Sequence, residues 1–325
     1  ANMRKTIVGI TSALAMMALG ANAAKAECGQ ISISEMNGAS AAVVTAVSKF
    51  LLEQGYGCKV KTVPSSTVPV VTSLAETGPP DIATELWLNG AASLPKLIED
   101  GKVVELTKVL SDGGVEGWYV PDYLVEKHPE LATIEGVLKN PDLVGGRFHQ
   151  CPEGWGCQIA NASLAKAFEL ESNGIKVFQH GSGETLATSI ASAYAEKKPW
   201  FGYYWAPTSV LGKYPMVRVD LGPVDEKIHA CNADKDCHEV GKSQYPASPV
   251  ATVVTTAFTQ KAPVAAELMK NVSFTNKQMG EVLAWKEDNR ASADEAAVYF
   301  IQNYKDVWSK WLNDDARKKL SSLLK

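Results

Sequence analysis

Hydrophobic and polar positions near the start of the chain follow the pattern of a strand, a helix and a second strand. Residues 31–34 alternate, residues 38–52 have the apolar spacing of a helix, and residues 58–63 alternate again. This order predicts a βαβ unit of a parallel sheet. Residues 81–86 predict the next strand, which ends at Trp87. Because open α/β sheets bind ligands beyond the C-terminal ends of their strands, Trp87 is a candidate site residue.

A second α/β stretch follows later in the chain. Residues 175–179 predict a strand, residues 181–196 a helix, and residues 200–205 an aromatic strand that ends in a tryptophan. Glycine and proline cluster in residues 113–121, and residues 225–249 are polar and contain prolines. We interpret these two segments as crossings between two lobes.

The predicted fold class is therefore α/β, with two lobes and a ligand cleft between them. The first lobe is expected to contain residues 27–118, and the second lobe residues 119–248. Residues 249–325, a strand followed by helices, are expected to return to the first lobe. A chain of this length can bury the cores of two domains.

Residues 1–26 have the pattern of a secretory signal peptide. A charged start is followed by a mainly apolar run over residues 7–19 and by Ala24-Lys25-Ala26. This pattern predicts cleavage near Ala26. The apolar run is shorter than the ~20 residues that a membrane-spanning helix needs, and no second long run follows. We therefore expect an exported protein without membrane insertion, periplasmic if the cell has two membranes.

Charge narrows the range of partners. The chain carries 32 basic and 36 acidic residues, a formal net charge of −4, and loss of residues 1–26 would change it to −7, since three basic residues and no acidic ones are removed. Nucleic acids and anionic membranes attract basic surfaces. We therefore expect neither as a partner.

The cysteines fall into three near pairs along the chain, and export to an oxidising space favours disulfides over a zinc site. Sequence alone leaves 15 pairings open. Cys28 and Cys58 each begin a predicted strand, so adjacent parallel strands would bring these two cysteines side by side. The six are Cys28, Cys58, Cys151, Cys157, Cys231 and Cys237.

The loop of residues 151–157 carries the clearest candidate chemistry. Trp155 stands between Gly154 and Gly156, and Glu153 precedes it by two positions. Glycine allows the backbone to approach a bound molecule closely. An aromatic face beside a carboxylate suits a small organic cation.

These residues give the chain a resemblance to the substrate-binding proteins of glycine betaine and choline-type ABC importers. The similarity covers nearly all of the chain after the signal peptide, and its motifs are residues 117–121, 151–157 and 203–207, together with Trp87. The resemblance implies a class II periplasmic-binding-protein fold whose tryptophans enclose a trimethylammonium group. It also implies a membrane permease of an ABC importer as partner, and we expect a monomer.

Carried over by position, the resemblance implies a binding site shared by the two lobes. Trp155 and Trp205 would stand in one lobe and Trp87 in the other. The backbone N–H groups of Gly156 and Cys157 would face an oxygen of the ligand.

Two departures from the family pattern bear on the ligand. Residues 88–91 contain no cation where betaine-binding relatives often place one for the carboxylate, and Glu153 stands where relatives often have proline. An added carboxylate and a missing cation disfavour a carboxylate-bearing ligand. We therefore expect trimethylamine N-oxide first, and then glycine betaine or choline.

Several candidates have a plainer interpretation. Trp200 is either a core residue or part of the binding site, and Glu153 either contacts the ligand or is only solvated. Asn232, Asp234 and Asp236 resemble the start of a calcium loop, but a surface hairpin is favoured because the acidic residue that ends such a loop is missing. No other cofactor is expected.

The alternative function is a secreted cysteine-dependent enzyme. It would use Cys157 or Cys151 as nucleophile and His149 or His180 as base. We favour the binding protein, because a reduced thiol is not expected in an oxidising space.

Overall fold

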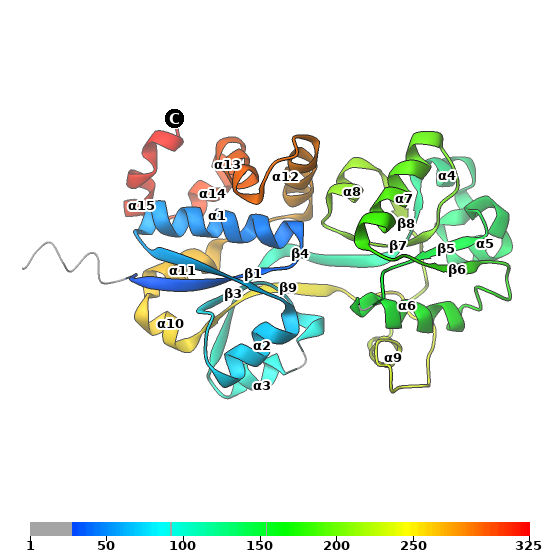
Figure 1. Cartoon of the computed structure of the whole chain (residues 1–325), viewed down its shortest axis with the longest axis horizontal. Helices are drawn as coiled ribbons and strands as arrows, with labels where there is room; N and C mark the ends of the chain where they lie inside the picture. The colour runs from blue at the N-terminus through cyan, green and yellow to red at the C-terminus, as the bar shows by residue number, and fades with distance from the viewer. Residues whose placement is uncertain (1–27, 92, 154) are drawn as a thin grey trace, which may run out of the picture.

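The structure is a computed structural model that describes residues 28–91, 93–153 and 155–325. The expected signal peptide at residues 1–26 lies outside these ranges, as does Gly154 of the cysteine loop. The chain forms two lobes that lie side by side and are joined by long strands (Figure 1). The expected two-lobed α/β fold is confirmed.

The first lobe is built around parallel strands, as the alternating pattern predicts. β1 (Gln30–Met36) pairs in parallel with β2 (Lys59–Ser65) and with β3 (Ile82–Trp87), and α1 (Ala39–Tyr56) connects the first two. The other helices of this lobe are α2 (Thr67–Glu76), α3 (Leu94–Glu99), α10 (Thr256–Lys261), α11 (Pro263–Asn271), α12 (Asn276–Asp288), α13 (Ala293–Asn303), α14 (Lys305–Trp308) and α15 (Asp314–Lys319).

The second lobe has its own parallel strands and one short antiparallel strand. β5 (Arg147–Gln150) pairs in parallel with β6 (Lys176–Gln179) and with β7 (Gly202–Ala206), and β8 (Met216–Arg218) pairs with the end of the crossing strand. Its helices are α4 (Asp122–Lys127), α5 (Ile134–Lys139), α6 (Gly156–Ala167), α7 (Gly183–Glu196), α8 (Ser209–Lys213) and α9 (Glu226–Asn232).

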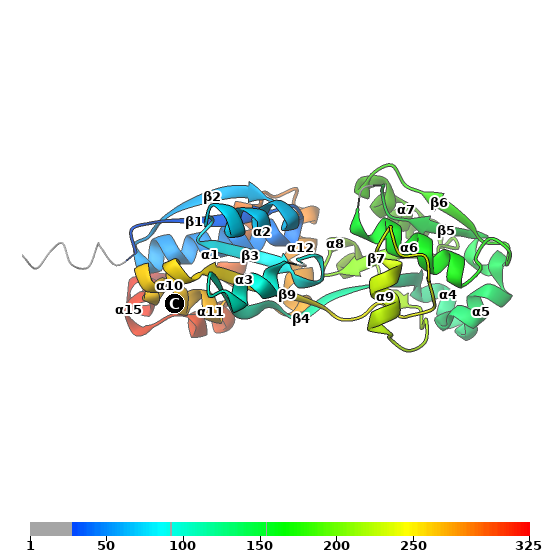
Figure 2. The ribbon, with the colours of Figure 1, turned by 90° about the horizontal axis from the view of Figure 1, so that it is seen from below.

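Two long strands connect the lobes and pair with each other. β4 (Val103–Pro121) runs from one lobe into the other, and β9 (Ser248–Thr255) returns antiparallel to it (Figure 2). Residues 113–121, which we interpreted as a crossing between the lobes, therefore lie inside a continuous strand. The resulting sheet order is β2-β1-β3-β9-β4-β7-β5-β6.

The buried side chains form separate cores in the two lobes. In the second lobe, Trp118 is fully buried and packs against Phe148 and Phe201. In the first lobe, Trp308 and Trp311 pack into the core beside the helices of the C-terminal segment. These tryptophans belong to the core packing.

Ion pairs between two helices also join the lobes, apart from the connecting strands β4 and β9. Lys213 at the end of α8 forms ion pairs with Glu287 at 3.2 Å and with Asp288 at 2.6 Å, both on α12. The two helices face each other across the gap between the lobes in Figure 1.

All six cysteines are paired as disulfides. The bonds are Cys28–Cys58, Cys151–Cys157 and Cys231–Cys237. The first joins the starts of the parallel strands β1 and β2, as their predicted adjacency suggested. No helix in the described ranges has the length and apolar character needed to cross a membrane.

Candidate functional site

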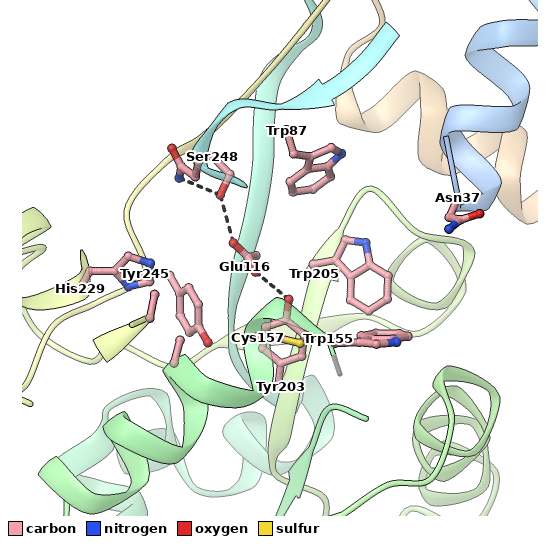
Figure 3. A pocket seen from close by; sticks show the side chains of 13 residues that line it. Asn37, Trp87, Glu116, Trp155, Cys157, Tyr203, Trp205, His229, Tyr245 and Ser248 are labelled. Atoms are coloured by element: carbon pink, nitrogen blue, oxygen red, sulfur yellow. Dashed lines mark hydrogen bonds between the residues drawn. The ribbon is translucent and has the colours of Figure 1, made fainter. Parts of the chain in front are cut away.

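A cavity of about 580 Å³ lies where the two lobes meet (Figure 3). Its lining comes from the ends of strands in both lobes, the start of α6, the helix α9 and the crossing strands. The described residues that line it are Asn37, Trp87, Asn89, Glu116, Trp155, Cys157, Ala160, Tyr203, Trp205, His229, Ala233, Tyr245 and Ser248.

Trp87 provides the wall from the first lobe. It is the last residue of β3, and its half-buried ring packs against the core of that lobe. The six-membered part of the ring lies directly on the backbone of Gly114, where any Cβ would overlap it. Glycine is therefore needed at this point of β4 because the indole ring occupies the space of a side chain.

Trp155 and Trp205 provide the walls from the second lobe. Their ring centroids are 5.4 Å apart and their planes are at 77°, so they form an open corner. Trp155 rests against Gly183, where a Cβ would lie 2.8 Å from the ring. The Gly181-Ser182-Gly183 segment thus begins α7, capped by the Ser182 side chain, and leaves room for the indole.

Glu116 places a carboxylate between these walls. It lies on the crossing strand β4, and its oxygens accept hydrogen bonds from the Tyr203 hydroxyl at 2.7 Å and from the Ser248 hydroxyl at 3.1 Å (Figure 3). Hydrogen bonds to an ionised acceptor are stronger than those between neutral groups, so the two hydroxyls hold the side chain in place. Among the described lining residues no lysine or arginine opposes this charge.

Tyr245 and His229 close the side of the cavity opposite the tryptophans. The ring of Tyr245 is buried, and the ring of His229 lies 5.3 Å from it. Burial lowers the pKa of His229, so its ring is neutral at neutral pH. α9 folds His229 against the cavity.

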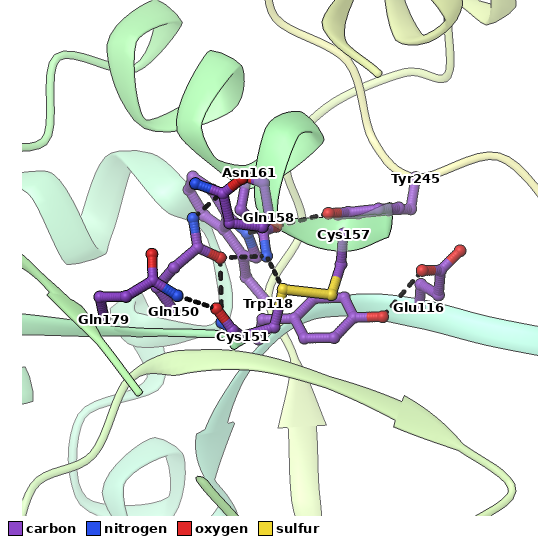
Figure 4. Close-up of a disulfide and its surroundings, with 10 residues drawn as sticks. Glu116, Trp118, Gln150, Cys151, Cys157, Gln158, Asn161, Gln179 and Tyr245 are labelled. Atoms are coloured by element: carbon purple, nitrogen blue, oxygen red, sulfur yellow. Dashed lines mark hydrogen bonds between the residues drawn. A yellow bond between two sulfur atoms is a disulfide. The ribbon is translucent and has the colours of Figure 1, made fainter. Parts of the chain in front are cut away.

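The Cys151–Cys157 disulfide fixes the start of α6 at the cavity (Figure 4). Cys157 lines the cavity, and the helix begins at Gly156. Asn161 is buried within this helix and accepts hydrogen bonds from the Trp118 indole, at 3.0 Å, and the Tyr245 hydroxyl. The first-turn amides of α6 are left at the helix end, which favours a ligand oxygen there.

Two of the predicted site residues are not brought to the cavity. Glu153 is exposed to solvent and is not among the lining residues, so the carboxylate expected from it is supplied by Glu116 instead. Trp200 is 1% exposed, and its ring stacks on His149 in the core of the second lobe. Of its two interpretations, the core is therefore the one that the structure supports.

The geometry does not support the cysteine-dependent enzyme. Cys151 and Cys157 are bonded to each other, so neither offers a thiolate. The rings of His149 and His180 are hydrogen bonded to each other at 2.8 Å. Burial lowers the pKa of His149 to about 3, which leaves a poor base.

Two of the three residues considered as calcium ligands, Asn232 and Asp234, point a side-chain oxygen at a backbone amide. The Asn232 side chain is buried and exchanges hydrogen bonds with Gly241, at 2.9 and 3.0 Å. Asp234 accepts from the amide of Asp236 at 2.9 Å, in a turn that follows α9 rather than in the expected hairpin. Within the described ranges, no group of three or more His, Cys, Asp or Glu side chains is placed to hold a metal ion.

Comparison with known proteins identifies a family. The family model described as the substrate binding domain of ABC-type glycine betaine transport systems matches residues 29–303. A curated relative, the glycine betaine/proline betaine-binding periplasmic protein of Escherichia coli K12, is 27% identical, with a match that covers 58% of this chain. The chain spans 57% of the length of that relative.

Solved structures share the fold. A crystal structure of the glycine/betaine/L-proline-binding protein from Borrelia burgdorferi has a TM-score of 0.65 at 16% identity and covers 89% of this chain and 99% of its own. Lactococcal OpuAC in a closed form with glycine betaine has a TM-score of 0.65 at 19% identity, covering 88% and 100%. An ABC-transporter choline-binding protein with choline has a TM-score of 0.63 at 16% identity, covering 91% and 98%.

Proposed function

We propose that this chain, which belongs to the family of substrate-binding domains of ABC-type glycine betaine transport systems, captures a trimethylammonium solute between its lobes. The proposed ligand is trimethylamine N-oxide, with choline and glycine betaine behind it. In this proposal the protein works in the periplasm and presents the solute to the membrane permease of an ABC importer.

The observation that carries the proposal is the composition of the interlobe cavity. Three indole rings and one carboxylate surround it, and its described lining has no lysine or arginine. A quaternary ammonium group donates no ordinary N–H hydrogen bond, so aromatic faces and a negative charge are what can recognise it. Each desolvated face contributes up to roughly 2 kcal/mol.

The choice of ligand rests on Glu116. Its carboxylate would repel the carboxylate of glycine betaine, and no cation among the described lining residues would compensate. Trimethylamine N-oxide has a compact methyl shell and an oxygen that the first-turn amides of α6 could bind. Choline has the same cationic group and no carboxylate.

The placement of the walls supports a capture mechanism. Trp87 belongs to the first lobe, whereas Trp155 and Trp205 belong to the second. A ligand that contacts all three rings binds the closed arrangement better than an open one and shifts the population toward it. The closed form is the shape that a permease would recognise.

Calorimetric titration with trimethylamine N-oxide, choline, glycine betaine and carnitine tests the proposal. We expect micromolar binding, near −8 kcal/mol, for the N-oxide and weaker binding of the two carboxylate-bearing compounds. Tighter binding of glycine betaine than of the N-oxide would overturn the ranking. Failure of all four would overturn the proposed ligand class.

A further inference from the structure

A buried acid lies directly behind one wall of the cavity. Glu85, on β3 two residues before Trp87, is 4% exposed. Its Oε1 accepts the indole N–H of Trp87 at 3.1 Å and the hydroxyl of Ser40, on α1, at 2.9 Å. Its Oε2 is buried and has no hydrogen-bond partner among the described residues. A carboxylate with one unsatisfied oxygen is costly to bury, so packing alone does not explain it.

The backbone at this acid is also unusual. Glu85 has a φ of 34°, and the pairing of β3 with β9 shifts between Ala83 and Leu86. A positive φ is uncommon outside glycine and costs free energy. A bulge of this kind re-aims a side chain, and here the side chain that it places is the acceptor for the Trp87 indole.

The Trp87 ring is therefore held at two places. The indole N–H is bonded to Glu85, while the six-membered ring lies on the backbone of Gly114. Gly114 limits how far the ring can move toward β4. Glu85 fixes how the ring is turned.

We propose that Glu85 is a positioning residue that orients Trp87 and places a negative charge behind its ring, and so sets the affinity of the cavity for a cation. This inference rests on the proposed function, because it assigns Trp87 to cation binding. The hydrogen bond draws electron density toward the indole, and the charge adds to the field at its face.

The charge on Glu85 depends on pH near neutrality. Burial raises the pKa of Glu85 to about 7, and the hydrogen bonds from Trp87 and Ser40 oppose this shift. These described contacts, from β3 and α1, carry no charge. The other titratable groups of the cavity include Glu116 on β4 and His229 on α9. Because a bound cation favours ionised Glu85, binding should release a proton below pH 7, and affinity should rise with pH.

A double-mutant cycle separates orientation from folding. We use choline chloride as the probe, since its charge is fixed, and titrate wild type, Glu85→Leu, Trp87→Phe and the double variant at pH 8. We expect Glu85→Leu to weaken binding about tenfold in wild type, the cost of one hydrogen bond to a charged group. In the Trp87→Phe background, where the indole N–H is absent, the same substitution should weaken binding only about threefold, because the negative charge is lost but no ring orientation is lost with it. An equal loss in both backgrounds would overturn the positioning role.

The pH profile tests the charge. Between pH 8 and pH 6 the Kd of choline should rise about two- to threefold in wild type and should stay nearly constant in Glu85→Gln, which keeps the acceptor and loses the charge. A profile that is unchanged in Glu85→Gln would assign the dependence to another group, such as His229, and would overturn this part of the inference.

A ligand-free measurement keeps the two proposals apart. In ¹⁵N spectra the indole N–H signal of Trp87, assigned with Trp87→Phe, should shift with a midpoint near pH 7 in wild type and not in Glu85→Gln. No shift in wild type would overturn the inference whether or not a ligand binds. If this shift is seen but neither choline nor trimethylamine N-oxide binds, the proposed function fails, and the contact of Glu85 with Trp87 still stands.

Discussion

Replacing Glu116 by glutamine tests the charge that the cavity offers to a cation. Glutamine keeps the size of the side chain and one acceptor for the Tyr203 hydroxyl, which lies 2.7 Å from the native carboxylate. The substitution removes the negative charge and leaves the indole walls in place. We expect weaker binding of the N-oxide and of choline.

The magnitude follows from the place of Glu116 in the cavity. Two unit charges about 5 Å apart interact by ~3 kcal/mol at an effective dielectric constant of ~20. Because Glu116 is only half-buried, solvent screening reduces this attraction to about 1–2 kcal/mol. We therefore expect the Kd for choline to rise roughly 5- to 30-fold. The Kd for glycine betaine should rise less, since the repulsion of its carboxylate is removed as well.

Calorimetric titration of both ligands measures these changes, and Glu153→Gln is the matched control. Glu153 is the exposed acid of the neighbouring cysteine loop and should be silent. An unchanged Kd for choline in Glu116→Gln would refute the charge argument. Weaker choline binding in Glu153→Gln instead would assign the negative charge that binds the cation to the loop of residues 151–157.

Three further predictions concern the second lobe. Trp155→Ala should raise the Kd about 30-fold, which corresponds to the roughly 2 kcal/mol that one aromatic face contributes. The Tm should not change, because the ring is 36% exposed. Unchanged binding in calorimetry would show that Trp155 does not contact the ligand. Gly183→Ala should weaken binding severalfold without lowering Tm, because its Cβ would meet the Trp155 ring, whereas Gly181→Ala has open space and should bind normally; equal affinities would contradict the packing argument. Burial lowers the pKa of His149 to about 3, so the neutral ring stabilises the native state fully above pH ~6.5 and progressively less as the pH falls toward 3. This group should lower the free energy of unfolding in urea by about 2 kcal/mol between pH 7.5 and pH 5. His149→Gln should remove that part of the drop, whereas His238→Gln, at an exposed position, should not.

Part of the site was predictable because it follows from strand direction. Trp87 and Trp205 lie at the ends of strands whose alternation is visible in the sequence, and the resemblance added Trp155. Tyr203 was missed, although its signal was present. It lies two positions before Trp205 on β7, and residues two apart on a strand face the same side.

The acid of the cavity was missed for a physical reason. Glu116 lies in a segment rich in glycine, which reads as a break, yet the segment is a strand in which Gly114 makes room for the Trp87 ring. Its partner Ser248 is 132 residues away in sequence. The position of His229 at the cavity likewise depends on how α9 packs, and no local sequence pattern predicts that packing. Trp200 remained ambiguous because its ring could face either side of its segment until the fold of the lobe was known.

The paired ribbon formed by β4 and β9 limits how the protein can open. The last pair of this ladder is Gly114 with Ser248, and Glu116 follows two residues later. Because the two lobes are joined through these hydrogen-bonded strands, opening should follow a hinge rotation about them. Groups near the pivot travel least, so Glu116 and Ser248 would stay almost fixed while the indoles of the two lobes separate. The arriving cation would then meet a stationary anchor first, and the aromatic faces would fold around it afterwards.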